Sequence, residues 1–314
     1  MTDPRIGVVG ATGAVGQVTL ALLAERGFGQ VRAFASSRSA GSTVAYGDGE
    51  LGVEEATVEA LGAGELDLCF FSVGTGPSSE LVPAAVEGGA VCVDKSSAFR
   101  LTDGVPLVVP EVNGDRATTH EGIVANPNCS TVQLVCALAP LHEIAGLRSV
   151  RVATYQSASG AGIERMEQLR AQRPGDGDIV MDWEFEGDES EEESKLRAET
   201  LKILELPELR LSATCARVPV LVGHSQAVWI ETEESLTPAQ ARQALEAAPG
   251  VRVSERPTAS EAAGGDEVLV GRIRPDTAGP GLALWIVCDN LRKGAALNAV
   301  QIAELLLARQ ALAT

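Results

Sequence analysis

The first third of the chain alternates short apolar runs with stretches of helical periodicity. The strand-like runs are RIGVVG, VRAFAS, DLCFFSV and AVCVDKS, and the helix-like stretches are VTLALLAERG and SSELVPAAVEGG. Strands that alternate with helices in this way form parallel sheets covered by helices. The pattern therefore predicts an α/β domain at the start of the chain.

The hydrophobic pattern continues differently after this region and indicates a second domain. We expect strands at PLVVPEV and GIVANPN, a helix at QLVCALAPLHEIAG, and the strand SVRVATYQ at the start of the second domain. An acidic loop runs into an amphipathic helix at GDESEEESKLRAETLKIL, and the later strand-like segments are CARVPVLVGHSQAVWIETE and LALWIVCD. The closing amphipathic helix, ALNAVQIAELLLARQAL, could return to pack on the first domain.

The composition and net charge indicate what class of protein this is and which partners it is not expected to bind. The chain has 314 residues, 45% of them hydrophobic and 22% charged, which is typical of a soluble globular protein with two domains. A formal net charge of -18 argues against nucleic acid or an anionic membrane as partner, and an anionic substrate needs a locally basic pocket. The six cysteines form no CxxC pair, and MTDPRIGVVG is no signal segment. We expect a reduced, cytoplasmic protein without a metal site.

One cysteine stands where a helix is predicted to begin. In ANPNCSTVQLVCAL, Asn128 is a good N-cap, so Cys129 falls among the first backbone N–H groups, which have no partner within the helix. These donors and the helix dipole favour a thiolate and can hold an oxyanion formed when sulfur attacks a carbonyl. Cys129 is therefore a candidate nucleophile, although position alone also suits a small buried apolar residue.

A glycine-rich loop follows the first predicted strand. GATGAVG places Gly10, Gly13 and Gly16 three residues apart, between a strand and a helix. Glycines allow the backbone to approach a pyrophosphate closely, and the following helix offers free N–H donors. The loop predicts a dinucleotide site.

The end of the second strand bears on the choice of cofactor. FASSRSAG lacks the acidic residue that usually binds the ribose hydroxyls of NAD. Arg38 could instead pair with a 2′-phosphate and stack on adenine, while Ser37 and Ser39 donate hydrogen bonds to it. We expect NADP, and the alternative is a solvated polar turn.

With Gln156, Arg217 and His224 following Cys129, the sequence resembles the aspartate-β-semialdehyde dehydrogenase family over nearly its whole length. The matching motifs are GATGAVG, SSAFR, PLVVPEVN, NPNCST, YQSASGAG, EESKLRAETLKI, RVPVLVGHS and KGAALNAVQIAE. The resemblance implies reversible reduction of L-aspartyl 4-phosphate to L-aspartate 4-semialdehyde with NADPH, in the biosynthesis of lysine (through diaminopimelate), threonine, methionine and isoleucine. It also implies a homodimer or homotetramer.

The resemblance implies a fold as well. A Rossmann-type doubly wound NADP-binding domain is expected at residues 1–128, completed by a C-terminal helix at 290–314. An α+β catalytic and dimerisation domain is expected at 129–289.

The family motifs carry specific roles onto residues of this chain. Cys129 is the nucleophile that forms a thiohemiacetal and then a thioester, His224 exchanges protons with the thiol and the substrate oxygen, and Gln156 orients the intermediate. The implied substrate ligands are Arg217 for the α-carboxylate, Glu192 for the α-ammonium, and Arg100 and Lys195 for the phosphate. The implied cofactor residues are Gly10, Thr12, Gly13, Ala14, Val15, Gly16, Ser37, Arg38, Ser39, Ser72, Ser159, Gly160 and Asn290.

Two departures and two alternatives accompany this interpretation. Lys95 stands where the family often has Asn, and the stretch DWEFEGDESEEES is unusually acidic. A reductase of a related acyl phosphate, such as N-acetylglutamyl phosphate, would share the cysteine and the histidine but would lack a reason for Glu192. A non-catalytic paralogue that only binds NADP would need none of Cys129, His224, Gln156 and Arg217.

Overall fold

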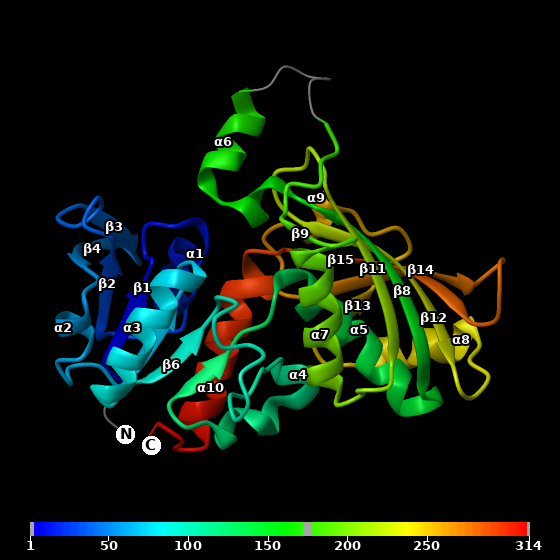
Figure 1. Cartoon of the computed structure of the whole chain (residues 1–314), viewed down its shortest axis with the longest axis horizontal. Coiled ribbons are helices and arrows are strands. Elements are labelled where there is room, and N and C mark those ends of the chain that lie inside the picture. Colours follow the sequence, from blue (N-terminus) through cyan, green and yellow to red (C-terminus); the bar gives the residue numbers. More distant parts are fainter. Residues whose placement is uncertain (1–2, 172–177, 313–314) are drawn as a thin grey trace. The chain divides into compact units, whose positions relative to one another are not determined.

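The computed structural model describes residues 3–171 and 178–312 (Figure 1). The chain divides into two compact units, one of Met1–Pro127 with Ala295–Thr314 and the other of Asn128–Gly294. We call them the first unit and the second unit. Within the described residues, no helix combines the length and the apolar character needed to cross a bilayer.

The first unit is built on a sheet of seven strands in the order β3-β4-β2-β1-β5-β6-β7. The strands are β1 (Ile6–Val9), β2 (Val31–Ala35), β3 (Thr43–Tyr46), β4 (Gly49–Glu55), β5 (Leu68–Phe71), β6 (Val91–Asp94) and β7 (Ile123–Ala125). All neighbours run parallel except the hairpin of β3 and β4. The order reverses between β1 and β5, and ligands of open α/β sheets bind at such a switch point.

Helices cover both faces of this sheet. Consecutive strand residues point to opposite faces, so Val8 joins a core with α1 (Ala14–Glu25) and α10 (Leu297–Ala308), whereas Val9 joins a core with α3 (Thr75–Glu87). The short helix α2 (Val58–Leu61) packs against α3. The predicted doubly wound α/β fold is confirmed, and α10 packs on α1 within the first unit as the closing amphipathic pattern suggested.

Two predicted strands need correction. PLVVPEV contributes only a single bridge, Leu107 to Ala125, because Pro110 begins the helix α4 (Pro110–Asn113), where the fixed φ and missing N–H of proline suit the first turn. A 3₁₀ helix, η1 (Gly114–Thr119), follows. CARVPVLVGHSQAVWIETE forms two strands, since Pro219 and Gly223, with φ of +99°, lie in the turn that interrupts it.

The second unit is built on a mixed sheet of six strands in the order β11-β8-β12-β15-β14-β13. The strands are β8 (Leu147–Gln156), β11 (Arg210–Arg217), β12 (His224–Thr232), β13 (Val251–Val253), β14 (Val268–Pro275) and β15 (Leu282–Cys288). The helices α5 (Cys129–Ala145), α7 (Glu191–Leu204) and α8 (Pro238–Ala247) contact this sheet, and α5 also contacts the other two. This arrangement is the expected α+β domain.

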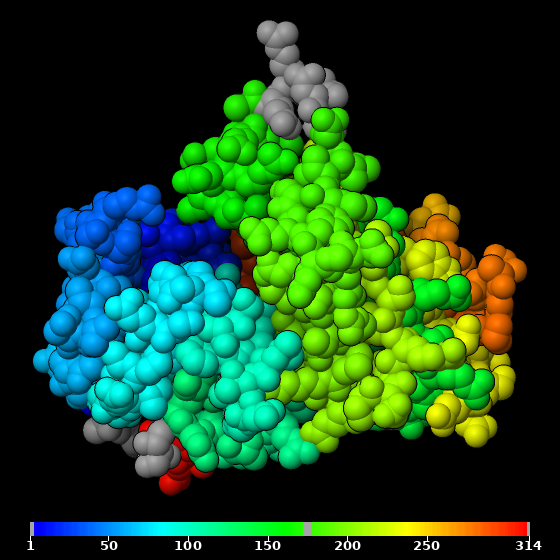
Figure 2. Space-filling view, in the orientation of Figure 1, coloured from blue at the N-terminus to red at the C-terminus, as the bar shows by residue number. Residues whose placement is uncertain are grey.

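Shorter elements complete the second unit. They are η2 (Ala158–Ala161), α6 (Ile163–Ala171), β9 (Phe185–Glu186), β10 (Glu189–Ser190), α9 (Ala259–Ala262) and the π-helical turn η3 (Arg292–Ala296), which runs into the first unit. Figure 2 shows α7 and the segment before it, in yellow-green, at the surface of the second unit.

Candidate active site

The glycine loop of the first unit packs tightly against the ends of β1 and β5. Gly10 has φ of +85°, and a Cβ added there would lie 2.5 Å from the carbonyl oxygen of Ser72. A Cβ on Gly16 would lie 2.1 Å from the carbonyl oxygen of Gly10. Only glycine fits at either position, so the backbone at the switch point stays open to a close ligand.

The loop leads directly into the N-terminus of α1. Gly13 is the N-cap of this helix and provides no side-chain cap, so the N–H groups of Ala14, Val15 and Gly16 are not capped by a side chain there. Uncapped donors and the positive end of the helix dipole suit a pyrophosphate. The loop thus fits the phosphates of a dinucleotide, with Thr12 in the same turn.

Arg38 lies in the turn that follows β2. The N–H of Ser39 donates to the carbonyl oxygen of Ser36 (2.9 Å), which shapes this turn, and Ser37 lies inside it. The Arg38 side chain is exposed and makes no ion pair within the described residues. The cation is accessible to a ligand phosphate at the end of the second strand.

Arg100 is held inside the first unit by backbone carbonyl groups. Its Nε donates to the carbonyl oxygen of Asn126 (3.1 Å), and its Nη2 donates to the carbonyl oxygen of Lys95. The residue is buried. These two hydrogen bonds fix the orientation of the Arg100 guanidinium, which is the group expected to bind phosphate.

Cys129 is the first residue of α5. The Oδ1 atom of Asn128 accepts a hydrogen bond from the N–H of Ser130 (2.8 Å), which confirms the predicted cap. Cys129 is partly exposed, whereas the other five cysteines are buried. Burial raises the pKa of Cys215 to about 12 and that of Cys288 well above its ordinary value. Cys129 is the accessible thiol of the chain.

Two buried carboxylates of α7 hold the residue before Cys129. The Oε1 atom of Glu192 accepts from Nδ2 of Asn128 (2.9 Å) and from Nε2 of Gln156 (3.0 Å). Glu199, two turns further along, accepts from the backbone N–H of Asn128 (2.7 Å). Glu192 thereby links the start of α5 to Gln156 at the end of β8.

Strand register gathers Gln156, Arg217 and His224 at one edge of the second sheet. Gln156 and Arg217 end the parallel strands β8 and β11 and are register partners. His224 begins β12, which runs antiparallel to β8. Nε2 of Gln226, two residues on, donates to the carbonyl oxygen of Ser130 (2.8 Å) in the first turn of α5. The three predicted residues thus share an edge that is bonded to the Cys129 turn.

His224 is fully buried and neutral. Its Nδ1 accepts a hydrogen bond from the backbone N–H of Ser157 (3.0 Å), and a backbone amide can only donate, so the ring proton resides on Nε2. Burial, reinforced by the charge of Arg217, lowers the pKa of His224 to about 3. Nε2 has no hydrogen-bond partner within the described residues. Nε2 is therefore a buried donor available to a ligand.

Three residues expected to contact the cofactor lie around His224 in the second unit. Oδ1 of Asn290 accepts from the hydroxyls of Ser157 and Ser159 (both 3.0 Å). A Cβ on Gly160 would lie 3.0 Å from Nε2 of His224. The hydroxyl groups bonded to Asn290 lie next to the His224 ring and hold it in place. Because Gly160 has no side chain, the space beside Nε2 stays free for a ligand.

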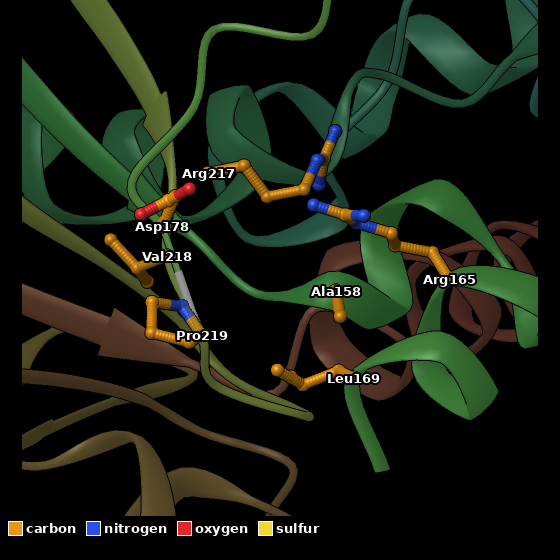
Figure 3. A pocket seen from close by; sticks show the side chains of 7 residues that line it. All are labelled: Ala158, Arg165, Leu169, Asp178, Arg217, Val218 and Pro219. Carbon is orange, nitrogen blue, oxygen red and sulfur yellow. The ribbon is translucent and has the colours of Figure 1, made fainter. Parts of the chain in front are cut away.

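Arg217 is buried and already paired. Its Nη1 donates to the carbonyl oxygen of Ser157 (3.0 Å), and its Nε lies 2.9 Å from each carboxylate oxygen of Asp182. The guanidinium carbon lies 4.8 Å from the ring centre of Trp183. Arg217 also lines a pocket with Arg165 of α6 (Figure 3). Figure 3 shows the two guanidinium groups close to each other.

Lys195, three residues after Glu192 on α7, is partly buried and pairs with Glu191. Other residues of the site were not foreseen. Asp182, Trp183 and Glu199 were not predicted as site residues. Glu199 could have been found, because it lies seven residues after Glu192 and shares its helix face. No local signal pointed to Asp182 or Trp183, whose contacts with Arg217 arise only in the fold.

Comparisons with known proteins agree with this geometry. Residues 5–120 match the model of the semialdehyde dehydrogenase NAD binding domain, and residues 138–188 and 179–293 match that of the semialdehyde dehydrogenase dimerisation domain. The aspartate-semialdehyde dehydrogenase of Aquifex aeolicus is 42% identical (96% of this chain, 97% of the relative), and that of Legionella pneumophila is 44% identical (96% and 95%).

Solved structures show the same similarity. Aspartate semialdehyde dehydrogenase II from Vibrio cholerae has 37% identity and a TM-score of 0.93, covering 98% of this chain and 99% of that one. The Candida albicans enzyme, solved with NADP, has 27% identity and a TM-score of 0.81, covering 99% and 100%. With matches of this extent in both sequence and fold, the chain belongs to the aspartate-semialdehyde dehydrogenase family of oxidoreductases of amino-acid biosynthesis.

Proposed function

We propose that the protein is an NADP-dependent, phosphorylating aspartate-semialdehyde dehydrogenase that works through Cys129. It interconverts L-aspartate 4-semialdehyde and L-aspartyl 4-phosphate. The observation that supports the proposal is His224, a buried neutral donor whose Nε2 has no partner among the described residues. It begins β12, whose Gln226 is hydrogen-bonded to the first turn of α5, where Cys129 lies.

In the oxidative direction, the Cys129 thiolate attacks the aldehyde carbon, and the carbonyl electron pair moves to oxygen. Nε2–H of His224 donates a hydrogen bond to that oxygen. When bound, NADP supplies the hydride chemistry, and a thioester is left on Cys129. Phosphate attacks the thioester carbon, and the C–S bond breaks to give the acyl phosphate and the thiolate. The reductive reaction reverses these steps.

The tautomer of His224 refines its role. Because Nε2 carries the proton in the free enzyme, the ring cannot accept the thiol proton at that atom. The N-terminus of α5 favours the thiolate instead, as helix termini do for anions. His224 then acts as a hydrogen-bond donor that stabilises the oxyanion.

The substrate anchors follow from the charges at the sheet edge. Arg217 binds the α-carboxylate, the buried carboxylate of Glu192 binds the α-ammonium, and Gln156, held by Glu192, orients the intermediate. Arg100 and Lys195 bind the phosphate. An N-acetylated substrate has no ammonium to match Glu192, which disfavours N-acetylglutamyl phosphate.

The cofactor residues of the first unit favour NADP. The pyrophosphate binds the Gly10 loop and the start of α1, near Ser72. Arg38, with Ser37 and Ser39, binds the 2′-phosphate. In a chain with a formal net charge of -18, such a local cation is needed to hold a phosphate.

We also infer that the protein is a homodimer formed through the outer face of the second sheet. This face, away from α5, presents Ala153, Tyr155, Trp229 and Trp285 at partly or largely exposed positions, and the rings of Tyr155 and Trp285 lie 5.5 Å apart. Partly exposed aromatic side chains are enriched at protein interfaces.

One assay tests the proposed activity. Protein, NADP, phosphate and L-aspartate semialdehyde are mixed, and the absorbance of the reduced cofactor is followed. We expect turnover that requires phosphate and is much slower with N-acetylglutamate semialdehyde. No turnover would support the non-catalytic alternative, and preference for the acetylated substrate would support the related reductase.

A further inference from the structure

The charge of Arg217 is matched in the free enzyme by a carboxylate of the chain itself. The Arg217 side chain is only 6% exposed, and Asp182 places both carboxylate oxygens 2.9 Å from its Nε. Trp183 covers a face of the same guanidinium. A buried guanidinium without a counterion is costly, so this pair stabilises the site before substrate arrives.

The segment that carries Asp182 is attached by few contacts. Val180 and Arg217 exchange two backbone hydrogen bonds, of 3.0 Å and 2.8 Å. Ile179 and Met181 are 68% and 52% exposed, and the Asp182 side chain is 35% exposed. Segments with few buried apolar contacts open at low free-energy cost. The Asp182 carboxylate can therefore move away from Arg217 without disturbing the sheet.

We propose that Asp182 is a specificity-determining residue, whose carboxylate occupies Arg217 in the free enzyme and competes with the α-carboxylate of the substrate. This inference rests on the proposed role of Arg217. A substrate carboxylate must displace Asp182 from Arg217, so the negative charge of Asp182 opposes its binding. Compounds without a carboxylate cannot compete with Asp182 for Arg217. The Asp182–Arg217 pair therefore raises the selectivity for carboxylate substrates and lowers the affinity for them.

The charge can be removed while the hydrogen bond is kept. In Asp182→Asn, the amide oxygen still accepts from Nε of Arg217, but the competing charge is gone. We expect the KM for the semialdehyde to fall by about three- to tenfold, with kcat and the KM for phosphate nearly unchanged. An unchanged or raised KM would overturn the proposal, since a residue that merely held Arg217 in place would give that result.

A matched control separates this contact from the general acidity of the segment. Asp188→Asn makes the same charge change six residues further on, at an exposed position. We expect it to leave the KM unchanged. If it lowers the KM as much as Asp182→Asn does, the effect is long-range electrostatics and the proposal is wrong. Asp182→Ser provides a second variant should the amide disturb folding.

A binding measurement does not depend on turnover. L-2-aminobutyrate keeps the α-carboxylate and α-ammonium of the substrate but lacks the aldehyde oxygen. We expect it to change the fluorescence of Trp183, to lose that signal in Trp183→Phe, and to bind Asp182→Asn more tightly than wild type. If L-2-aminobutyrate bound Asp182→Asn and the wild type with equal affinity, the proposal for Asp182 would be wrong, while the proposed function of Arg217 would stand. If removal of the Arg217 side chain left this affinity unchanged, the proposed function of Arg217 would be wrong.

Discussion

At the scale of single residues, burial decides the protonation state of His224. The ring is fully buried, and its ordinary pKa of 6.5 falls to about 3. Between these values the unfolded chain binds a proton that the folded chain does not. The free energy of unfolding must therefore rise with pH across this window, by up to about 1.4 kcal/mol per pH unit from this one group.

This linkage gives a prediction for His224→Gln. Lowering the pH from 7.5 to 5 costs the wild type about 2 kcal/mol of unfolding free energy through this residue, and the variant escapes that loss. The measurement is urea unfolding of both proteins at the two pH values. The comparison uses the difference between pH values, so any general destabilisation by the substitution cancels. Equal pH dependence in both proteins would show that His224 titrates normally.

A second residue-scale prediction concerns the nucleophile. Cys129→Ser should keep the fold and NADP binding but lower turnover by at least about a thousandfold, because a hydroxyl is a far poorer nucleophile than a thiolate at neutral pH. Iodoacetamide should alkylate Cys129 first, with buried Cys136 on the same helix as internal control. Faster labelling of Cys136, or an active serine variant, would contradict the assignment.

Among the structural elements, the start of α7 holds two adjacent glutamates, Glu192 and Glu193, that make different contacts. Glu193 closes a capping box with Ser190, and its Oε1 also accepts from the N–H of Cys215 (2.9 Å). Glu192 faces Asn128 and Gln156 instead. Glu193 therefore stabilises the start of the helix, and Glu192 holds the side chains of Asn128 and Gln156.

These different contacts predict opposite effects. Glu193→Ala should lower the free energy of unfolding by about 2 kcal/mol, since two buried donors lose their acceptor, with little change in the KM for the semialdehyde. Glu192→Gln should raise that KM about tenfold or more, because an amide cannot neutralise an ammonium. Denaturant unfolding and steady-state kinetics on both variants test the pair. Reversed results would exchange the two roles.

The turn after β2 predicts the cofactor preference. Arg38→Ala should weaken NADP binding by about 1.5 to 3 kcal/mol, the usual contribution of a charged hydrogen bond, and should leave NAD binding nearly unchanged. Fluorescence titrations of both proteins with each cofactor at fixed salt measure this. If the wild type binds NAD as tightly as NADP, or the variant loses both equally, Arg38 does not select the cofactor.

At the scale of the whole molecule, the outer face of the second sheet predicts the assembly. Trp229→Glu should convert a dimer to a monomer, because a charge would be buried at the centre of the proposed interface. Light scattering with size-exclusion chromatography measures the mass. Ile144→Glu places the same charge at an exposed apolar position on α5 and should leave the dimer intact. A dimer that survives Trp229→Glu would place the interface elsewhere.

Features that depend on local patterns could be predicted from the order of residues alone. Hydrophobic periodicity predicted the parallel sheet and the helices of the first unit, since burial on two faces leaves continuous apolar runs. Turn and cap chemistry predicted the Gly10 loop and the start of α5 at Cys129. Where a proline stood inside an apolar run, as in PLVVPEV, pattern alone predicted a strand that the structure replaces with a helix.

The protonation state of His224 and the pairing of Arg217 depend on contacts that form only when the chain folds. The tautomer of His224 depends on the N–H of Ser157, 67 residues away, and the pairing of Arg217 depends on Asp182, 35 residues away. Glu199 reaches Asn128 across 71 residues. No local pattern encodes such contacts, because strand register and helix packing bring these groups together and burial then sets their charge.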